Sequence, residues 1–476
     1  MKAPVTHMFF LDKRNQFHLD SIAKIAKDSE NVKLLVVDFG SFDYPLQAPW
    51  RVPNEYGKGS PGIANMFNAL GADYCDAASL HGEPLSLSQD EIEKIETAVR
   101  STSISYLQTF EEVGERAGFF TQVIRGRLRR QASKAMALSI AAIQEFRPEK
   151  IYIENGRFAV SQANLLAARR FGVKVIFPEL QSEASRLYLR TFRVHDRVAM
   201  QEAAKELTAQ VSRATLEKLT DQWKSRWRPV TSELNPFTAL WDTGDIPWLA
   251  PDEHIALFAT SSTDEFAALD LDWALTAWES QLAAFQAVWD RLSHKELTPV
   301  LRIHPNLLNK HPLTAFRELK EFKEFSERNP RFKVIWPASS VNTYELIKRA
   351  RVVIVHGSTV GLEASLEGLP VVCTNRSIYD LIADVTNVNG PEDLSLIDSM
   401  SHTSSPLGAM KLISYLEMTH EGVGPNEAGV NISKVRRTRL IWGSILSGSM
   451  ISMIFEKRWR LARKVVLAIS PKEDLL

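Results

Sequence analysis

The chain has 476 residues, 45% of them hydrophobic and 24% charged, and its 57 Lys and Arg balance 57 Asp and Glu. This length exceeds what one hydrophobic core normally organises, so two domains with extensions are expected. The balanced charge excludes a global field that attracts nucleic acid, and nucleic acid is not an expected partner. Cys75 and Cys373 stand far apart without metal-ligand spacing, which argues against a disulfide framework or structural zinc and fits a reducing cytoplasm.

In the first half of the chain, short apolar runs typical of buried strands alternate with segments of helical periodicity. The predicted strands cover 7–12, 32–39, 150–156 and 173–180. Helices are predicted over 18–29 and 161–172, the second ended by Gly172 as a C-cap, and a long helical region covers 86–149. The first residues do not form a signal peptide, and no stretch contains the roughly 20 apolar residues that span a bilayer.

A segment with four prolines and no clear period, near 225–253, predicts a linker. Beyond it the alternation restarts, with predicted strands at 254–261, 298–306, 332–339, 351–358 and 370–375. Helices are predicted between them at 273–292, 313–325, 342–350 and 359–368. Two such series predict the α/β class, with two doubly wound Rossmann-like domains that face a cleft. The predicted domains are 1–235, 250–430 and a helical tail over 431–476.

Polar residues follow four of the strands predicted in the second half. Ligands of open α/β sheets bind beyond the carboxyl ends of the strands, so these groups are expected to converge on one rim. The segments are ATSSTDEF, RIHPN, WPASS and HGST, which supply Ser261, Ser262, Thr263, Asp264, Glu265, Arg302, His304, Asn306, Ser339, Ser340, His356, Ser358 and Thr359.

The HGST turn leads into a helix, whose first N–H groups favour an anion. Gly357 allows close backbone approach, Ser358 and Thr359 add hydroxyl donors, and Glu363 is placed to accept hydrogen bonds from ribose hydroxyls. The alternative is that Ser358 only caps the helix. In RIHPN, proline holds His304 on extended backbone, where its imidazole can donate to a phosphate.

RIHPN followed by HGSTVGLEASLEGLPVV resembles the donor domain of GT-B glycosyltransferases that build bacterial surface polysaccharides. The likeness covers about residues 250–385 and is nearest to the capsule polysaccharide biosynthesis family, which includes transferases of 3-deoxy-manno-octulosonic acid (Kdo). The chain is also similar to bacterial sialyltransferases, although it lacks their acidic-acidic-Gly triplet. The resemblance implies that His304 and Pro305 form an HP motif at the donor phosphate, that Ser358 and Thr359 bind that phosphate, and that Glu363 binds ribose. The ATSSTDEF strand end would form part of the donor pocket.

In the first domain, IENGRFAVSQANLLAARRFG resembles an NGR segment of the same family, which places Asn155 and Arg157 on the acceptor side. A glycosyl transfer needs a carboxylate or His as base or nucleophile. Glu154, Glu179 and Asp38 are candidates at strand ends, with His304 near the departing phosphate, and strand-end acids also cap helices. The LDLD segment at 269–272 is interpreted as a helix start, so no obligatory metal is predicted.

The C-terminal segment over 435–465 places basic clusters on both sides of the apolar run LIWGSILSGSMISMIF. Two interpretations stay open: a terminal helix that crosses back to the first domain, or an in-plane helix on anionic lipid. The second predicts a cytoplasmic protein in peripheral contact with the inner membrane.

The preferred hypothesis is a metal-independent glycosyltransferase that moves a sugar from a nucleotide donor onto a growing surface polysaccharide or lipopolysaccharide glycan. CMP-linked Kdo or a related acidic sugar is the leading donor, a lipid-linked or polymeric glycan is the expected acceptor, and no cofactor is expected beyond the nucleotide sugar. The alternatives are a CDP-polyol phosphotransferase, a UDP-N-acetylglucosamine epimerase and a non-catalytic scaffold in a polysaccharide synthesis or export complex.

Overall fold

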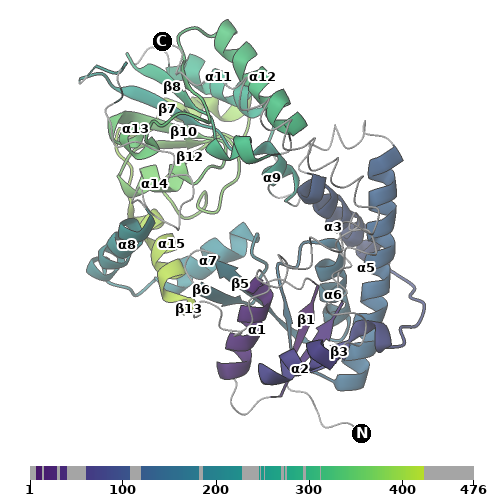
Figure 1. Ribbon diagram of the computed structural model, residues 1–476. Helices are drawn as coiled ribbons and strands as arrows, with labels where there is room; N and C mark the ends of the chain where they lie inside the picture. Colours follow the sequence, from purple (N-terminus) through teal and green to yellow (C-terminus); the bar gives the residue numbers. More distant parts are fainter. Residues whose placement is uncertain are drawn as a thin grey trace. The chain divides into compact units, whose positions relative to one another are not determined.

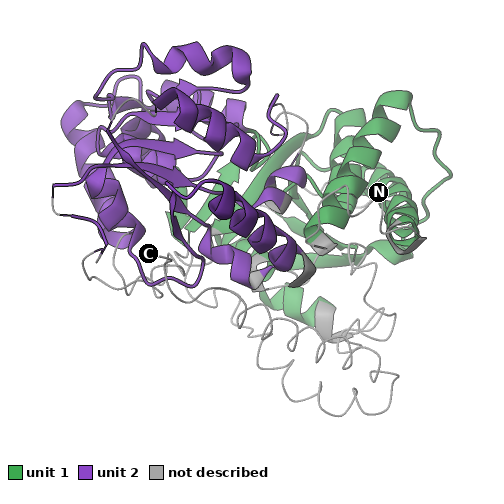
Figure 2. Cartoon of the chain, turned by 90° about the horizontal axis from the view of Figure 1, so that it is seen from above, with its two compact units in different colours: residues 1–107, 111–196, 419–453 green, residues 108–110, 197–418, 454–476 purple. Residues whose placement is uncertain are grey.

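The computed structural model divides the chain into two compact units, which Figure 2 colours separately. Unit 1 contains 1–107, 111–196 and 419–453, and unit 2 contains 108–110, 197–418 and 454–476. The segment 197–227, which the sequence assigned to the first domain, thus belongs to unit 2. The structure describes residues 7–12, 16–28, 33–39, 61–107, 119–181, 186–227, 246, 248–250, 252–269, 273, 276–292, 296–310 and 312–422. The tail predicted over 431–476 and the LDLD aspartates lie outside these residues.

Unit 1 is built on a seven-stranded sheet with the order β13-β6-β5-β4-β1-β2-β3. The five strands from β5 to β3 are parallel, while β6 runs antiparallel to β5 and β13 antiparallel to β6. The strands are β1 His7–Leu11, β2 Leu34–Asp38, β3 Ala72–Asp76, β4 Lys150–Ile153, β5 Lys174–Gln181, β6 Arg186–Arg190 and β13 His420–Gly422.

Helices cover both faces of this sheet, because alternate strand residues point to opposite sides. Met8 and Phe10 of β1 pack with α3, α5 and α6, while Phe9 and Leu11 pack with α1 and α2. Figure 1 shows these two layers of helices. The helices are α1 Gln16–Asp28, α2 Pro61–Ala69, η2 Ala77–Ser79, α3 Gln89–Leu107, α5 Phe119–Phe146 and α6 Ala159–Arg170.

Unit 2 contains a six-stranded sheet, entirely parallel, with the order β12-β11-β10-β7-β8-β9. The chain therefore lays strands outward in one direction from β7 and in the other from β10, so the strand order reverses between these two strands. The strands are β7 Ile255–Ala259, β8 Thr298–Arg302, β9 Lys333–Ile335, β10 Ala350–Val355, β11 Val371–Cys373 and β12 Thr386–Asn387.

The helices of unit 2 also form two layers. α11 and α12 share a core with one face of the sheet, in which Phe258 and Trp289 meet edge to face at 6.3 Å between ring centroids. α13 and α14 contact β7, β10 and β11, and α7 and α8 pack on α15. The helices are α7 Arg197–Leu207, α8 Arg213–Trp227, α9 Thr263–Ala267, α11 Gln281–Leu292, η4 Pro305–Asn309, α12 Pro312–Arg328, α13 Thr343–Arg349, α14 Val360–Leu366, η5 Pro391–Ile397 and α15 Leu407–Met418.

These two doubly wound units confirm the predicted α/β, Rossmann-like fold class. The start of α11 differs from the prediction: this helix begins at Gln281 rather than near Trp273. The hydroxyl of Ser280 accepts a hydrogen bond from Ala283 N at 3.1 Å, so Ser280 starts the helix as a capping residue. Trp278 precedes it and donates its indole N–H to Val388 O at 2.9 Å.

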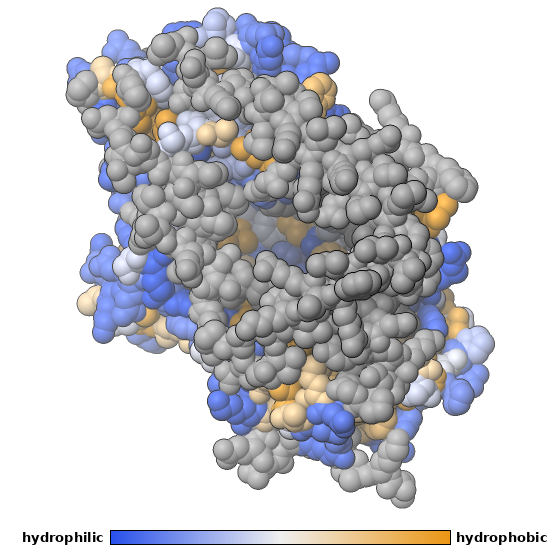
Figure 3. Space-filling model, viewed as in Figure 1, coloured by the Kyte–Doolittle hydropathy of each residue, from blue (hydrophilic) through white to orange (hydrophobic). Residues whose placement is uncertain are grey.

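Figure 3 shows mostly hydrophilic residues along the top of the view, and α12 carries i,i+4 ion pairs such as Arg317–Glu321. Among the residues that the structure describes, no helix has the length and apolarity required to cross a membrane.

Candidate functional site

The polar strand ends of unit 2 meet at the point where the strand order of its sheet reverses. Ala259 of β7 is in register with Val355 of β10 on one side and with Arg302 of β8 on the other. The residues that follow these strands therefore leave the sheet along one edge. In open α/β sheets the crevice beyond the carboxyl ends at this reversal is where ligands bind. The structure thus brings the ATSS, RIHPN and HGST segments together, as the sequence predicts.

The end of β7 is tied to the end of β8. Thr260 accepts a hydrogen bond on its hydroxyl from His304 N at 2.8 Å. Ser261 N donates to the side-chain oxygen of Gln281 at 3.1 Å, and Gln281 donates to the Thr263 hydroxyl at 3.3 Å. Ser261 and Ser262 are buried, and the Ser261 hydroxyl has no hydrogen-bond partner among the described residues. These contacts hold the loop beside His304.

The ring of His304 has a defined orientation. Its Nδ1 accepts a hydrogen bond from Asn306 N at 3.1 Å, so His304 caps the short helix η4 that begins at Pro305. In a neutral imidazole that accepts at Nδ1, the proton is on Nε2. His304 therefore presents a donor at Nε2, which is the role that phosphate binding requires.

Arg302 has its contact inside the protein. It lies within β8, is buried, and donates Nη1 to Trp336 O at 2.8 Å. This bond ties β8 to the chain that leaves β9. The carbonyl contact places this guanidinium among the strands, and its predicted contact with a ligand stays a prediction.

His356 is held as a neutral ring. Burial lowers the pKa of His356 to about 4. Its Nδ1 lies 2.9 Å from the Thr374 hydroxyl, which donates its own proton to Val355 O at 3.2 Å. Because the hydroxyl has one proton, His356 donates from Nδ1, and its Nε2 is an acceptor. The predicted role as a donor to phosphate is thus better suited to His304.

The neutral state of His356 makes stability depend on pH. A histidine whose pKa is depressed by folding stabilises the protein above its unfolded pKa of 6.5, and that contribution is lost as pH falls towards 4. We expect wild type to lose roughly 3 kcal/mol more than His356→Asn over this window, since one pKa unit corresponds to about 1.4 kcal/mol. Urea denaturation of both proteins at pH 7 and at pH 4.5 measures the difference. Equal losses in the free energy of unfolding of the two proteins would contradict the prediction.

Gly357 and Ser358 form a close-packed turn. Gly357 has φ +83°, in the left-handed region that favours glycine. The Ser358 carbonyl accepts a hydrogen bond from Tyr379 Oη at 2.6 Å, and its hydroxyl accepts from Val360 N at 3.4 Å, near the limit of a hydrogen bond. Ser358 is buried and Thr359 is exposed. The hydroxyl contact is consistent with capping, so the structure keeps both interpretations of Ser358.

Glu363 has a partner that the sequence did not indicate. The side chain is buried, and its Oε1 accepts a hydrogen bond from the Trp227 indole at 3.2 Å. Trp227 is at the end of α8, far away in the sequence. The predicted ribose contact stays a prediction, in a position where one carboxylate oxygen already binds an N–H group.

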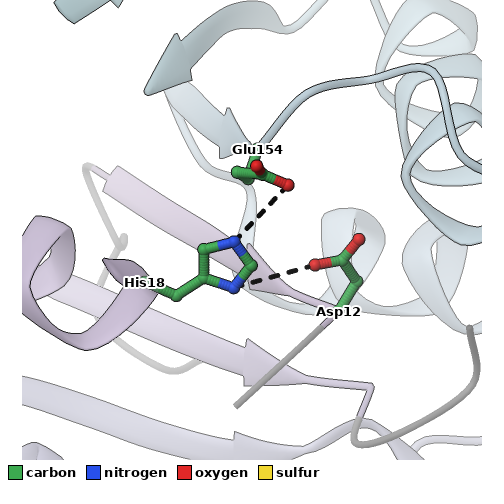
Figure 4. A group of neighbouring side chains, drawn as sticks. All are labelled: Asp12, His18 and Glu154. Atoms are coloured by element: carbon green, nitrogen blue, oxygen red, sulfur yellow. Dashed lines mark ion pairs between the residues drawn. The ribbon is translucent and has the colours of Figure 1, made fainter. Parts of the chain in front are cut away.

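The sheet of unit 1 also reverses its strand order, between β1 and β4. Asp12 follows β1, Glu154 follows β4, and His18 comes from the first turn of α1. His18 Nε2 lies 3.4 Å from Glu154 Oε2, and His18 Nδ1 lies 3.9 Å from Asp12 Oδ1 (Figure 4). Asp12 and His18 are buried, whereas Glu154 is partly exposed. Of these three residues, only Glu154 was predicted from the sequence as a candidate site residue.

The second predicted glutamate, Glu179, belongs to the same edge. Arg190 of β6 donates to its Oε2 at 2.5 Å. Burial raises the pKa of Glu179, the Arg190 guanidinium opposes that rise, and the nearby Glu154 carboxylate adds to it. Asp38, the third candidate, is buried, and it accepts a hydrogen bond from Tyr74 Oη at 3.2 Å.

The NGR segment forms the turn that follows β4 at this edge. Asn155 and Gly156 have φ +61° and +70°, and a Cβ on Gly156 would lie 2.6 Å from the Phe177 ring. Arg157 donates Nη1 to the Ser101 hydroxyl at 3.2 Å, which ties this turn to α3. Arg157 thus braces the loop, and the predicted acceptor contacts of Asn155 and Arg157 stay predictions.

His195 is a member of this edge that sequence reasoning missed. Burial lowers the pKa of His195 to about 3; Arg157 lowers it next, Glu154 opposes the change, and Arg193 and Arg190 lower it further. His195 is therefore a neutral ring among charged groups. No spacing or motif around it distinguishes it in the sequence.

Comparisons with known proteins give no family for the chain. No family model and no curated protein matches it. Among solved structures, it is similar to the Thermosulfurimonas dismutans KpsC beta Kdo 2,4 transferase, with 11% identity over 56% of this chain and 79% of that chain and a TM-score of 0.35. The UDP-GlcNAc 2-epimerase of Methanocaldococcus jannaschii has 11% identity over 91% of this chain and 99% of that chain, with a TM-score of 0.31. The Thermosulfurimonas dismutans KpsC beta Kdo 2,7 transferase has 15% identity over 57% of this chain and 87% of that chain, with a TM-score of 0.30. With such TM-scores, these likenesses carry no weight for the function of this chain.

Proposed function

We propose that the chain is a nucleotide-sugar-dependent glycosyltransferase of bacterial surface polysaccharide synthesis, with unit 2 as the donor unit and unit 1 as the acceptor unit. The observation that carries this proposal is the convergence of Ser261, His304 and Ser358 at the strand-order reversal of an all-parallel sheet. Backbone and hydroxyl donors at such an edge suit a nucleotide phosphate. Unit 1 adds ionisable groups at its own reversal point, and glycosyl transfer needs such a group to take the proton of the acceptor hydroxyl.

The finer assignments belong to the same proposal. A CMP-linked acidic sugar such as Kdo is the proposed donor, and a lipid-linked or polymeric glycan is the proposed acceptor. Peripheral contact of residues 435–465 with the cytoplasmic face of the inner membrane is proposed from their basic and apolar pattern.

Calorimetric titration of the purified chain with CMP, CDP, UDP and GDP tests the donor unit. We expect selective CMP binding, weakened roughly tenfold or more in His304→Ala and Ser358→Ala, because each lost hydrogen bond to a charged group is worth about 1.5–3 kcal/mol. His254→Ala is a matched control, since His254 precedes β7 at the opposite edge of the same sheet and contacts Arg351. Its nucleotide affinity should equal that of wild type.

The other outcomes separate the alternatives. Preference for UDP would move the proposal to a hexosyltransferase or an epimerase, which turns over a nucleotide sugar without an acceptor. Preference for CDP would favour a polyol phosphotransferase. If no nucleotide binds, the enzyme proposal fails and the scaffold interpretation replaces it.

A further inference from the structure

The Asp12, His18 and Glu154 side chains come from three different elements and meet where the strand order of unit 1 reverses (Figure 4). The side chains of Asp12 and His18 are 2% and 5% exposed, whereas that of Glu154 is 29% exposed. Glu154 is therefore the member of the group that other molecules can reach. Asp12 and His18 lie behind it.

The imidazole of His18 stands between the two carboxylates, with a different ring nitrogen towards each. A neutral ring has one N–H, so it would present a lone pair to one of the two oxygens. A protonated ring has an N–H on both nitrogens and a charge that both carboxylates attract. The geometry therefore favours the imidazolium form of His18.

A bound metal ion suits this geometry less well. The three ligand atoms lie within 4.8 Å of one another, so an Asp, His and Glu could in principle share an ion. Ligands on a tetrahedral ion with bonds of about 2.1 Å lie roughly 3.4 Å apart. Nδ1 and Asp12 Oδ1 are 3.9 Å apart, and an imidazole binds a given ion through only one nitrogen. His18 Nε2 and Glu154 Oε2 are 3.4 Å apart, which fits that spacing, but Asp12 faces the other ring nitrogen, so the group offers one ion two well-placed ligands rather than three.

Glu179, the glutamate near Glu154, has a different environment. Burial raises the pKa of Glu179, the Arg190 guanidinium opposes this rise, and the Glu154 charge adds to it. Two carboxyl groups whose surroundings push them towards different protonation states are a recurrent arrangement for acid and base chemistry.

We propose that His18, positioned by Asp12, is held as an imidazolium that keeps Glu154 ionised as the proton acceptor for the incoming hydroxyl. This role rests on the proposed function. In the step, the acceptor O–H bond breaks as an O–H bond forms on Glu154. The acceptor oxygen then bonds to the sugar carbon, and the bond between that carbon and the donor phosphate breaks with its electron pair on the phosphate. His18 is a positioning residue, because it acts through Glu154.

The other charged and titratable groups that influence this pair come from β5, β6, the β4–α6 turn and the segment after β6. They are Glu179, Arg190, Arg157, Arg193 and His195. The charge of His18 should depend on Asp12 and Glu154 first, because its two ring nitrogens face these two carboxylates.

Ring-¹⁵N-labelled histidine in the full chain tests the charge of His18 directly by NMR at pH 7.5, with His18→Gln to assign its signals. Both ring nitrogens of His18 should show shifts of protonated nitrogen in wild type. In Asp12→Asn and in Glu154→Gln the ring should return to the neutral pattern. Glu179→Gln is the matched control, since Glu179 pairs with Arg190 and should leave the His18 signals in the protonated pattern.

A neutral His18 in wild type would overturn the proposal. So would stoichiometric zinc binding that shifts Nε2 and is lost in His18→Gln, because the group would then be a metal site. If Asp12→Asn does not fold, Glu154→Gln provides the same comparison at a partly exposed position.

Transfer rates test the role of Glu154. We expect kcat of Glu154→Gln to fall about 10²-fold or more, a usual contribution of a general base, with unchanged nucleotide affinity. His18→Gln should shift the pH profile of kcat, which a merely structural role would not do. An unshifted profile would overturn the positioning role. If wild type binds no nucleotide, the proposed function fails, whereas the ring spectra still decide the charge of His18.

Discussion

Asp380→Ala should destabilise unit 2 by about 3–5 kcal/mol, because it leaves a buried guanidinium without its counter-charge. Arg197 Nη1 donates to both carboxylate oxygens of Asp380, at 2.9 and 3.0 Å, and Gln201 Nε2 donates to Oδ1 at 3.0 Å. Arg197, Gln201 and Asp380 are all buried. The effect of the substitution is thus expected to be among the largest for a single residue of this chain.

The ion pair also fixes the loop that supports the turn at Ser358. Gln201 Oε1 accepts hydrogen bonds from Leu381 N at 2.6 Å and Ile382 N at 3.0 Å, so α7 holds the chain directly after Asp380. Tyr379, the residue before Asp380, donates to the Ser358 carbonyl. Loss of the pair should therefore weaken nucleotide binding together with stability.

Urea denaturation followed by circular dichroism measures the change in the free energy of unfolding. Asp252→Ala is the control, because Asp252 is exposed, and exposed substitutions usually change stability by less than about 0.5 kcal/mol. A loss below about 1 kcal/mol for Asp380→Ala would mean that the guanidinium finds water or another acceptor, contrary to its burial.

The fold of both units could be predicted because its signals are local. Strands such as β1 and β10 are continuous apolar runs, since helices cover both faces of the sheet, and helix ends such as Gly172 have their own conformational signal. β3 was missed because ADYCD mixes acidic and apolar residues on a half-buried strand. β6 was missed as well; RLYLR is a short run with an arginine at each end, and it runs antiparallel in a sheet that is otherwise parallel.

The site could be predicted only in part, for a related reason. The carboxyl ends of parallel strands share one edge, so residues after β7, β8 and β10 could be grouped from the sequence. No comparable rule predicts which residues of distant segments will come into contact. Trp227 with Glu363, and His18 with Glu154, become neighbours only through packing, and the proton on each His304 or His356 ring is set by those contacts.

Gly357→Ala should abolish nucleotide binding by the donor unit and cost stability through two separate effects. At φ +83° a Cβ costs roughly 1–2 kcal/mol in the backbone alone. That Cβ would lie 2.5 Å from Phe266 Cζ and 2.6 Å from Arg376 O. The ring can rotate, but the carbonyl is backbone and cannot move without the loop that follows β11. The turn itself must shift, and it includes both His356 and Ser358.

Gly368→Ala separates these two effects within the same unit. Gly368 has φ +72°, and a Cβ there would lie 3.4 Å from Ser404 O, an ordinary contact. It should therefore show the backbone cost without the displacement, and its nucleotide affinity should equal that of wild type. Calorimetry and urea denaturation of both variants measure the difference. Gly357→Ala could instead lose no more stability than Gly368→Ala and still bind nucleotide. In that case the close approach of Phe266 and Arg376 does not define the donor turn, and the nucleotide phosphate must be bound elsewhere on the edge.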